Sequence, residues 1–507
     1  MRNRILAAIC FALCGCLCGC HLQQKGTTRF PDSDLNHPPP ASWNGPRFLL
    51  SQDYPETEPP AEAHVWDKID FNTQPKEYLA EVLRYIYEGN IEVDWAVQKN
   101  AVRHWFHAPW MHAPEIKQKG VTCRDEKGRE FVHGLTRERA TSLAEINFGQ
   151  DTTHCVSNIE NWAVSIYNAP GGYVIGRLWH EMIDHRGSSF PDPKKFPKDF
   201  PYGTVVAKLL FTAATESDVP FLSGSPEWQA DIKRDGVPVI VRLLQVDVAV
   251  RDKRAESSGN DQKRSGWVFG TFIYDKDTTP IFDDTKDSTR PWRKVKPIGL
   301  IFGNDLNQTV LVDPAIKLTQ HLGCQERLVG PVDNLSTSCL SCHAMAEIDA
   351  VQPFSSIRYD VNGFARYQQC RNQADVQHWF RTLAYGEAFT EGGVSLNLSL
   401  QLSNGIIRYC QEKKGNCPPD KTCPPTGTCL PDNRLYATDA AVPCPPDPAP
   451  TECPIKQTGE QLGPSPNNGL PAAVESPLTE SPETSRDGDV EELKMRNRAI
   501  KRPSQQK

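Results

Sequence analysis

The sequence predicts an α+β fold in which an antiparallel β-sheet forms the core and helices lie at its periphery. Two observations lead to this prediction. Short apolar or alternating segments follow one another between turn residues over residues 162–302, as in sequential antiparallel strands. An amphipathic helix is predicted before them, because apolar residues recur at helical spacing from Leu79 to Ile86 and Gly89 stands where a C-cap is expected.

The predicted strands follow in chain order. Residues 162–167 and 173–175 flank the turn residues 168–172, and this pattern predicts a hairpin. Residues 203–211 are apolar on both faces, which is typical of a central, buried strand. Further strands are predicted at residues 237–250, 267–274 and 298–302, with a charged loop over 251–264 and a half-exposed strand over 394–400.

Lys208 interrupts the apolar pattern of residues 203–211. A lysine in such a run is almost never buried without a partner or a chemical role. Two interpretations are open: the side chain reaches the sheet edge or an acidic partner, or it serves a binding site.

The composition is that of a globular core diluted by long polar segments. The 507 residues include 56 Lys and Arg against 63 Asp and Glu, a net charge of -7, and no basic stripe dominates, which argues against nucleic acid as a partner. Polar and proline-rich ends predict a five-part organisation: signal 1–20, tether 21–74, folded domain 75–410, a Cys/Pro-rich disulfide segment 411–455 and a disordered tail 456–507.

The N-terminus resembles a bacterial lipoprotein signal. Arg2 and Arg4 precede an apolar stretch over 5–17, and Leu17-Cys18-Gly19-Cys20 matches the lipobox, so Cys20 is the residue expected to be lipidated. The same pattern ending at Cys16 also fits, and a plain membrane anchor is the alternative. The resemblance implies a protein tethered to a lipid bilayer of the bacterial cell envelope, facing the periplasm, with the outer membrane as the expected site.

The pentapeptide Cys339-Leu340-Ser341-Cys342-His343 has the CxxCH pattern of a c-type haem attachment site. In that pattern the two thiols form thioethers with the haem and the histidine binds the iron from one side. One covalent haem c per chain is therefore expected, attached at Cys339 and Cys342 with His343 as the iron ligand. The alternative is a disulfide or redox CxxC pair that happens to precede a histidine.

Ten further cysteines lie outside the signal and the CxxCH motif, an even number that suits an exported protein with disulfides. Their pairing is open, although Cys123 and Cys155 could close one loop. The ten are Cys123, Cys155, Cys324, Cys370, Cys410, Cys417, Cys423, Cys429, Cys444 and Cys453.

The second axial position of the iron is either open or filled by a side chain. The usual downstream methionine is absent, because only Met345, adjacent to the motif, and Met495, in the polar tail, follow it. An open iron binds small molecules such as nitric oxide, carbon monoxide, hydroxylamine or peroxide, and a filled one favours electron transfer. Side chains that could fill it are His104, His107, Met111, His112, His133, Met182 and His378.

Three segments carry a family resemblance: residues 200–208, ending in Gly203-Thr204-Val205-Val206-Ala207-Lys208, the aromatic strand after Gly266-Trp267, and the CxxCH motif. Together they resemble the cytochrome P-four-sixty family. The family contains periplasmic haem proteins that oxidise hydroxylamine and nitric oxide, and gas-binding relatives called cytochrome c-prime-beta. The resemblance covers residues 162–345 and implies that Lys208 is a haem crosslink or a pocket residue.

Three function classes follow from these features. The broad expectation is a lipid-anchored monohaem c-type cytochrome with redox function that oxidises a small nitrogen compound and passes electrons to a redox partner protein. An electron-transfer cytochrome with a six-coordinate haem is the second class. A non-catalytic lipoprotein that binds a gaseous ligand is the third.

Overall fold

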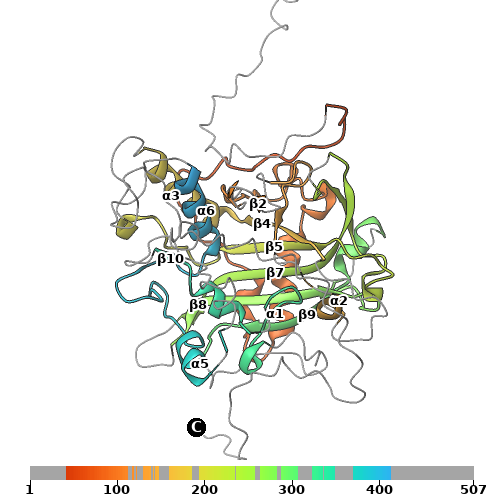
Figure 1. Cartoon of the computed structure of the whole chain (residues 1–507). Coiled ribbons are helices and arrows are strands. Elements are labelled where there is room, and N and C mark those ends of the chain that lie inside the picture. The colour runs from red at the N-terminus through yellow and green to blue at the C-terminus, as the bar shows by residue number, and fades with distance from the viewer. Residues whose placement is uncertain are drawn as a thin grey trace, which may run out of the picture. The chain divides into compact units, whose positions relative to one another are not determined.

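Antiparallel strands form the main sheet of this computed structural model, and helices flank the sheet, so the predicted α+β class with an antiparallel sheet is confirmed (Figure 1). The structure describes residues 41–111, 117–118, 121–122, 129–138, 141, 143–147, 159–184, 193–233, 236–256, 263–282, 287–305, 323–334, 336–348, 369–370 and 372–412.

The main sheet has seven strands in the order β3-β4-β5-β7-β8-β9, with β6 paired to β7, and every pair is antiparallel. Its strands are β3 (Thr136–Arg137), β4 (Asn161–Tyr167), β5 (Val205–Thr212), β6 (Glu227–Ala230), β7 (Val239–Glu256), β8 (Ser265–Tyr274) and β9 (Val295–Ile301). Two small ladders pair β1 (Lys117–Gln118) with β2 (Val121–Thr122), and β10 (Glu347–Ile348) with β11 (Val394–Ser395).

The described α-helices are α1 (Pro75–Tyr87), α2 (Leu143–Ile146), α3 (Ala169–Asp184), α4 (Cys339–His343), α5 (Gln373–Trp379) and α6 (Leu400–Glu412). Short 3-10 turns lie at Val65–Lys68, Ile91–Val93, Val97–Lys99, Pro193–Lys195, Pro220–Leu222, Asp287–Arg293 and Cys324–Glu326. Helices α3 and α6 lie side by side (Figure 1), where Trp179 contacts Tyr409 edge to face.

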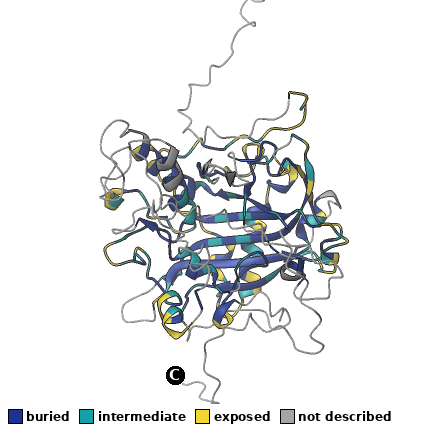
Figure 2. Cartoon of the chain, in the orientation of Figure 1, coloured by how far each residue is buried: buried dark blue, intermediate teal, exposed yellow. Residues whose placement is uncertain are grey.

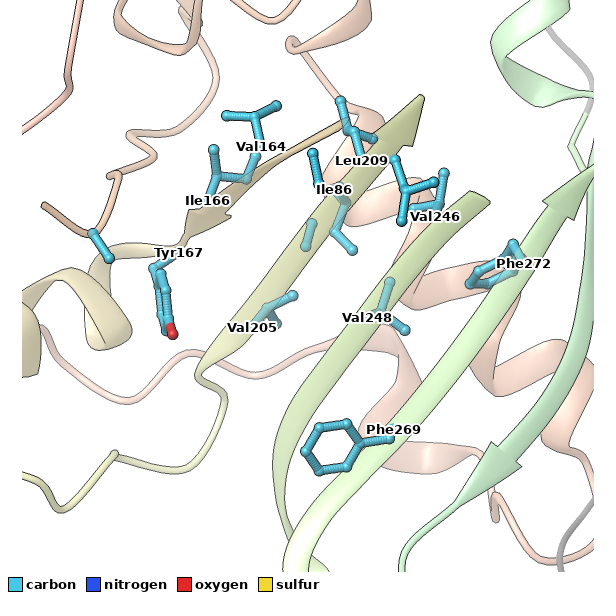
Figure 3. Packing of buried hydrophobic residues seen from close by; sticks show 14 of the residues in the cluster. Ile86, Val164, Ile166, Tyr167, Val205, Leu209, Val246, Val248, Phe269 and Phe272 are labelled. Atoms are coloured by element: carbon cyan, nitrogen blue, oxygen red, sulfur yellow. The ribbon is translucent and has the colours of Figure 1, made fainter. Parts of the chain in front are cut away.

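Helix α1 covers one face of the main sheet, as its amphipathic pattern predicts. Its apolar residues Leu79 and Ile86 are at most 1% exposed, and Ile86 points toward the sheet residues Leu209 and Val246 (Figure 3). A side chain on Gly270 of β8 would collide with Leu79, so glycine lets the helix approach the strand closely. Gly89 has φ 78° just after the helix, the left-handed conformation expected of a C-terminal glycine.

The central strands are predicted correctly. The segments 203–211, 237–250, 267–274 and 298–302 become β5, β7, β8 and β9, and these strands form the dark blue, buried centre of Figure 2. Strand β7 is longer than predicted, because it continues through the first part of the predicted loop 251–264. There the Arg251 guanidinium donates to the Gly266 carbonyl at 2.9 Å and pairs with Glu256 at 2.6 Å, which satisfies the charge within the sheet.

The predicted hairpin over 162–175 is wrong in its second half. Residues 162–167 belong to β4, but residues 173–175 lie inside helix α3. Pro170 stands in the first turn of α3, where a missing N–H is tolerated, and Val174, Leu178 and Met182 continue a helical repeat of buried residues. The turn-like residues 168–172 therefore start a helix instead of a hairpin.

Two further expectations fail at the edges of the domain. In the predicted strand 394–400 only Val394 and Ser395 pair, because the left-handed residues Asn397 and Leu398 end the extended run and α6 begins at Leu400. The described part of the predicted tether, from residue 41 to 74, packs on the domain: Trp66 is 2% exposed and Phe71 is fully buried.

Cys324 and Cys370 form a disulfide, which confirms that the chain uses disulfides. Cys123, Cys155 and the segments 411–455 and 456–507 lie outside the described residues, except for the end of α6, and so does the signal with Cys20. No helix among the described residues is long and apolar enough to cross a membrane.

Candidate functional site

A cavity of about 280 Å³ lies against one face of the main sheet and brings four predicted site residues together: Lys208, Cys339, Cys342 and His343. Its other walls are formed by residues 332–334, by residues of the segment 337–343, which includes α4, and by residues 397–401. The strands around it and the CxxCH motif are distant in sequence, so the fold assembles the site.

Helix α4 presents the motif because its first turn is capped by its own serines. The Ser338 hydroxyl accepts a hydrogen bond from the Ser341 N–H at 3.0 Å, and the Ser341 hydroxyl accepts one from the Ser338 N–H at 2.8 Å. Residues three and four apart lie on one helix face, so Cys339, Cys342 and His343 are directed to the same side. Both cysteines are free and half-buried in the cavity wall.

The thiols of the motif are held in the protonated form. Burial raises the pKa of Cys342 to about 11. Burial also raises the pKa of Cys339, and the nearby Asp333 and Asp247 carboxylates raise it further. A redox-active CxxC pair needs a depressed thiol pKa for nucleophilic attack, and these thiols have the opposite shift.

His343 is fixed in one tautomer by a backbone carbonyl. Its Nδ1 lies 2.7 Å from the Leu398 oxygen, and since a carbonyl only accepts, Nδ1 carries the proton and Nε2 keeps a free lone pair. Burial lowers the pKa of His343 to about 4 although the Leu398 contact raises it, so the imidazole is neutral. A neutral imidazole with an oriented Nε2 can ligate a metal.

The carbonyl that orients His343 is itself held in an unusual backbone conformation. Asn397 has φ 51° and Leu398 has φ 64°, values that favour glycine or asparagine. The Asn397 side chain locks this turn: it accepts from the Gly386 N–H at 2.7 Å and donates to the Lys198 carbonyl at 2.8 Å. Sequence reasoning missed this residue, and asparagine's tolerance of positive φ is the signal that could have found it.

A polar row crosses the sheet on the cavity side. Lys208 pairs in register with Ser165 on β4 and Asp247 on β7, and Asp247 pairs with Thr271 on β8. The Lys208 ammonium forms an ion pair with Glu138 at 3.2 Å, with the Lys208 side chain 26% exposed. Desolvation lowers the pKa of Lys208, but the carboxylates of Glu138, Asp247 and Asp333 outweigh it and raise the pKa above its ordinary value.

Sequence reasoning did not single out Asp247 as a site residue. The Gln245 amide donates to both carboxylate oxygens at 2.7 and 2.8 Å, and the Thr271 hydroxyl donates at 2.9 Å. Desolvation raises the pKa of Asp247 above its ordinary value, while Lys208 opposes that shift. Gln245 and Asp247 alternate with apolar residues in the strand, and that alternation was the available signal.

The remaining sheet lining of the cavity is mainly apolar. Next to the polar row, the cavity is lined by Val206, Ala249 and Phe269, which are register partners on three neighbouring strands. The ring centroids of Phe269 and His343 lie 4.7 Å apart. Trp267 also lines the cavity and is 3% exposed, and its indole N–H has no partner among the described residues. Buried donors are normally hydrogen-bonded, so this N–H is available to an acceptor atom on a bound ligand.

The described side chains that could supply a sixth iron ligand lie elsewhere: His104, His107, Met111, His133, Met182 and His378 are not among the cavity-lining residues. His107 is buried and its Nδ1 accepts the Ser51 N–H at 3.0 Å. His133 stacks on Trp228 with ring centroids 4.1 Å apart. His112 lies outside the described residues.

Comparison with known proteins gives no relative. No family model, no curated protein and no solved structure matches the chain. The described residues contain no group of three or more His, Cys, Asp and Glu side chains that could hold a metal ion.

Proposed function

We propose that the chain is a lipid-anchored monohaem c-type cytochrome with redox function. Cys339 and Cys342 would hold the haem through thioethers, and the Nε2 of His343 would bind the iron. The observation that carries this proposal is that both free thiols and the oriented imidazole line one cavity.

The residues around the motif suit a haem. A porphyrin is a flat apolar ring with two carboxylates, and the cavity offers apolar and aromatic walls such as Val206 and Phe269. The unpartnered N–H of Trp267 could donate to a haem carboxylate. The raised pKa of the Cys339 thiol speaks against the alternative of a redox CxxC pair.

The haem would supply one-electron chemistry and a binding position for a small molecule at its iron. The chain's own residues shape what reaches that position. The Leu398 carbonyl keeps His343 in its ligating tautomer, and Lys208, Asp247 and Thr271 provide hydrogen-bonding groups in the cavity. Electrons taken from a small nitrogen compound such as hydroxylamine or nitric oxide would pass to a redox partner protein.

An open iron is preferred over the six-coordinate electron carrier. His343 is the one histidine among the described cavity-lining residues, and no methionine is among them. Lys208 is a poor substitute ligand, because its neighbours keep the amine protonated. Its raised pKa also works against a nucleophilic attack on the haem, so we propose Lys208 as an ion-paired cavity residue and treat the crosslink as the alternative.

Absorption spectra of the exported protein test this proposal. The ferric protein should be high-spin, and the ferrous protein should bind carbon monoxide with a shift of its Soret band. Reduction of the haem on adding hydroxylamine would support the enzyme, whereas carbon monoxide binding without such reduction would support a gas-binding lipoprotein. A low-spin spectrum that carbon monoxide leaves unchanged would contradict the open iron and favour the electron carrier.

A further inference from the structure

The charged groups in the cavity wall are strongly unequal in sign. Among the described lining residues, Glu138, Asp247 and Asp333 are acidic, and Lys208 is the one lysine or arginine. His343 also lines this wall, as the proposed iron ligand. The cavity therefore carries an excess of negative charge.

The single ammonium cannot act as a receptor for anions. Lys208 is bound to Glu138 at 3.2 Å and is the cross-strand neighbour of Asp247. Directly opposed side chains in an antiparallel pair lie within about 5.5 Å at their Cβ atoms, so both carboxylates act on the same Nζ. Its charge is already compensated before any ligand enters.

The other two acids are anchored and cannot turn away from the cavity. Asp247 is held by the Gln245 amide at 2.7 Å and by the Thr271 hydroxyl at 2.9 Å. Asp333 accepts the Gly330 N–H at 2.7 Å. Gln245 is fully buried, so the carboxylate that it holds has a fixed position.

We propose that this cavity selects small neutral or cationic molecules with N–H or O–H donors and excludes small anions. Carboxylates in a site of low dielectric repel an incoming anion more strongly than they would in water, and they accept hydrogen bonds from a neutral amine or hydroxylamine-type molecule. Azide and nitrite would therefore bind poorly to an iron that neutral ligands reach easily. The inference rests on the proposed haem function and specifies its ligand class.

Ligand titrations of the ferric holoprotein at mildly alkaline pH test the selection. Azide is the anionic probe and imidazole the neutral one, and each is followed by the Soret band. Asp247→Asn should raise azide affinity about 10-fold and should not raise imidazole affinity, because only the anion is repelled by the carboxylate. Asp277→Asn is the matched control, because Asp277 is an exposed surface acid paired with Lys276, and it should leave both affinities unchanged.

The unaltered protein supplies a second test that does not depend on the variant folding. Salt screens repulsion, so azide affinity should rise with ionic strength while imidazole affinity stays constant. Azide affinity that falls or stays constant with salt, or that Asp247→Asn leaves unchanged, would overturn the selection. Haem content and carbon monoxide binding test the proposed function separately, because neither depends on the charge of the cavity.

Discussion

The two faces of the main sheet use the same strands for different purposes. On the face covered by α1, Ala207 and Leu209 of β5 are at most 1% exposed and belong to the hydrophobic core together with Val246 (Figure 3). On the other face the intervening Lys208 is 26% exposed and belongs to a polar row. A strand's period of two thus separates residues that stabilise the fold from residues that shape a cavity.

The comparison predicts that changes on the cavity side alter chemistry and that changes on the α1 side alter stability. The cavity wall contains the polar side chains of Lys208, Asp247 and Thr271, which a ligand can use. On the α1 side the buried residues Leu79, Leu83 and Ile86 are apolar, and the hydroxyl of buried Tyr78 is already bound to Asp252 of β7 at 3.0 Å.

The largest effect is expected from Cys339→Ser combined with Cys342→Ser. Covalent haem should be lost completely, because thioethers need both thiols, while the fold persists since both side chains lie in the cavity wall. The measurement is the amount of haem that stays bound to the chain on a denaturing gel. Cys324→Ser with Cys370→Ser, which removes the described disulfide, is the control and should keep its haem. Haem retained by the first double variant would contradict the attachment site.

Leu83→Ala on α1 should lower the free energy of unfolding by about 2–5 kcal/mol, because Leu83 is fully buried and the change leaves a cavity in the core. Denaturant unfolding measures the loss. The haem spectrum of the folded variant should match that of the unaltered protein. A changed spectrum would mean that the two faces of the sheet are not independent.

Two variants of Asn397 test whether this residue positions His343 through the Leu398 carbonyl. Asn397→Gly tolerates φ 51° but loses the side-chain hydrogen bonds, whereas Asn397→Val also pays about 1–3 kcal/mol for a left-handed β-branched residue. Weakening the Leu398 contact makes the imidazole a poorer donor to ferric iron, so the reduction potential should rise, more for valine than for glycine. Equal potentials in all three proteins would show that Asn397 does not position His343.

Lys208→Met should change the free energy of unfolding least, by about 1 kcal/mol or less, because a partly exposed ion pair contributes little. Because the pKa of Lys208 is raised in the folded protein, its charge contributes stability that is fully present below the ordinary lysine pKa. This stabilisation is lost as the pH rises through the pKa of the folded state, so Lys208→Met should lose less stability than the unaltered protein at alkaline pH. Glu138→Gln is the control, because it removes the ion pair but keeps the lysine. A ferrous Soret band that shifts more in Lys208→Met than in Glu138→Gln would support the crosslink.

The sheet was predictable because its strands have strong patterns. Residues 203–211 and 267–274 are long apolar runs, and the helix at Leu79 to Ile86 has a clear repeat. Helix α3 was missed because the Pro170-Gly171-Gly172 run looks like a turn when only local propensity is considered, whereas tertiary packing of Val174 and Leu178 decides the outcome.

Only those site residues that a short stretch of sequence identifies could be predicted. The CxxCH motif is contained in five residues and Lys208 is conspicuous among apolar neighbours. Asp247, Asp333 and Asn397 join the site through strand register and loop packing, which no short pattern encodes. The described sixth-ligand candidates lie outside the cavity wall, and His107, for example, accepts a hydrogen bond from the Ser51 N–H instead.

The mass of the exported chain, purified from a host that matures c-type haem and then denatured, tests the central claim most directly. We predict a mass that exceeds that of the polypeptide by one haem, with the added mass on the proteolytic peptide that contains Cys339 and Cys342. A chain with the mass of the unmodified polypeptide, or haem on a peptide without these two cysteines, would contradict the account.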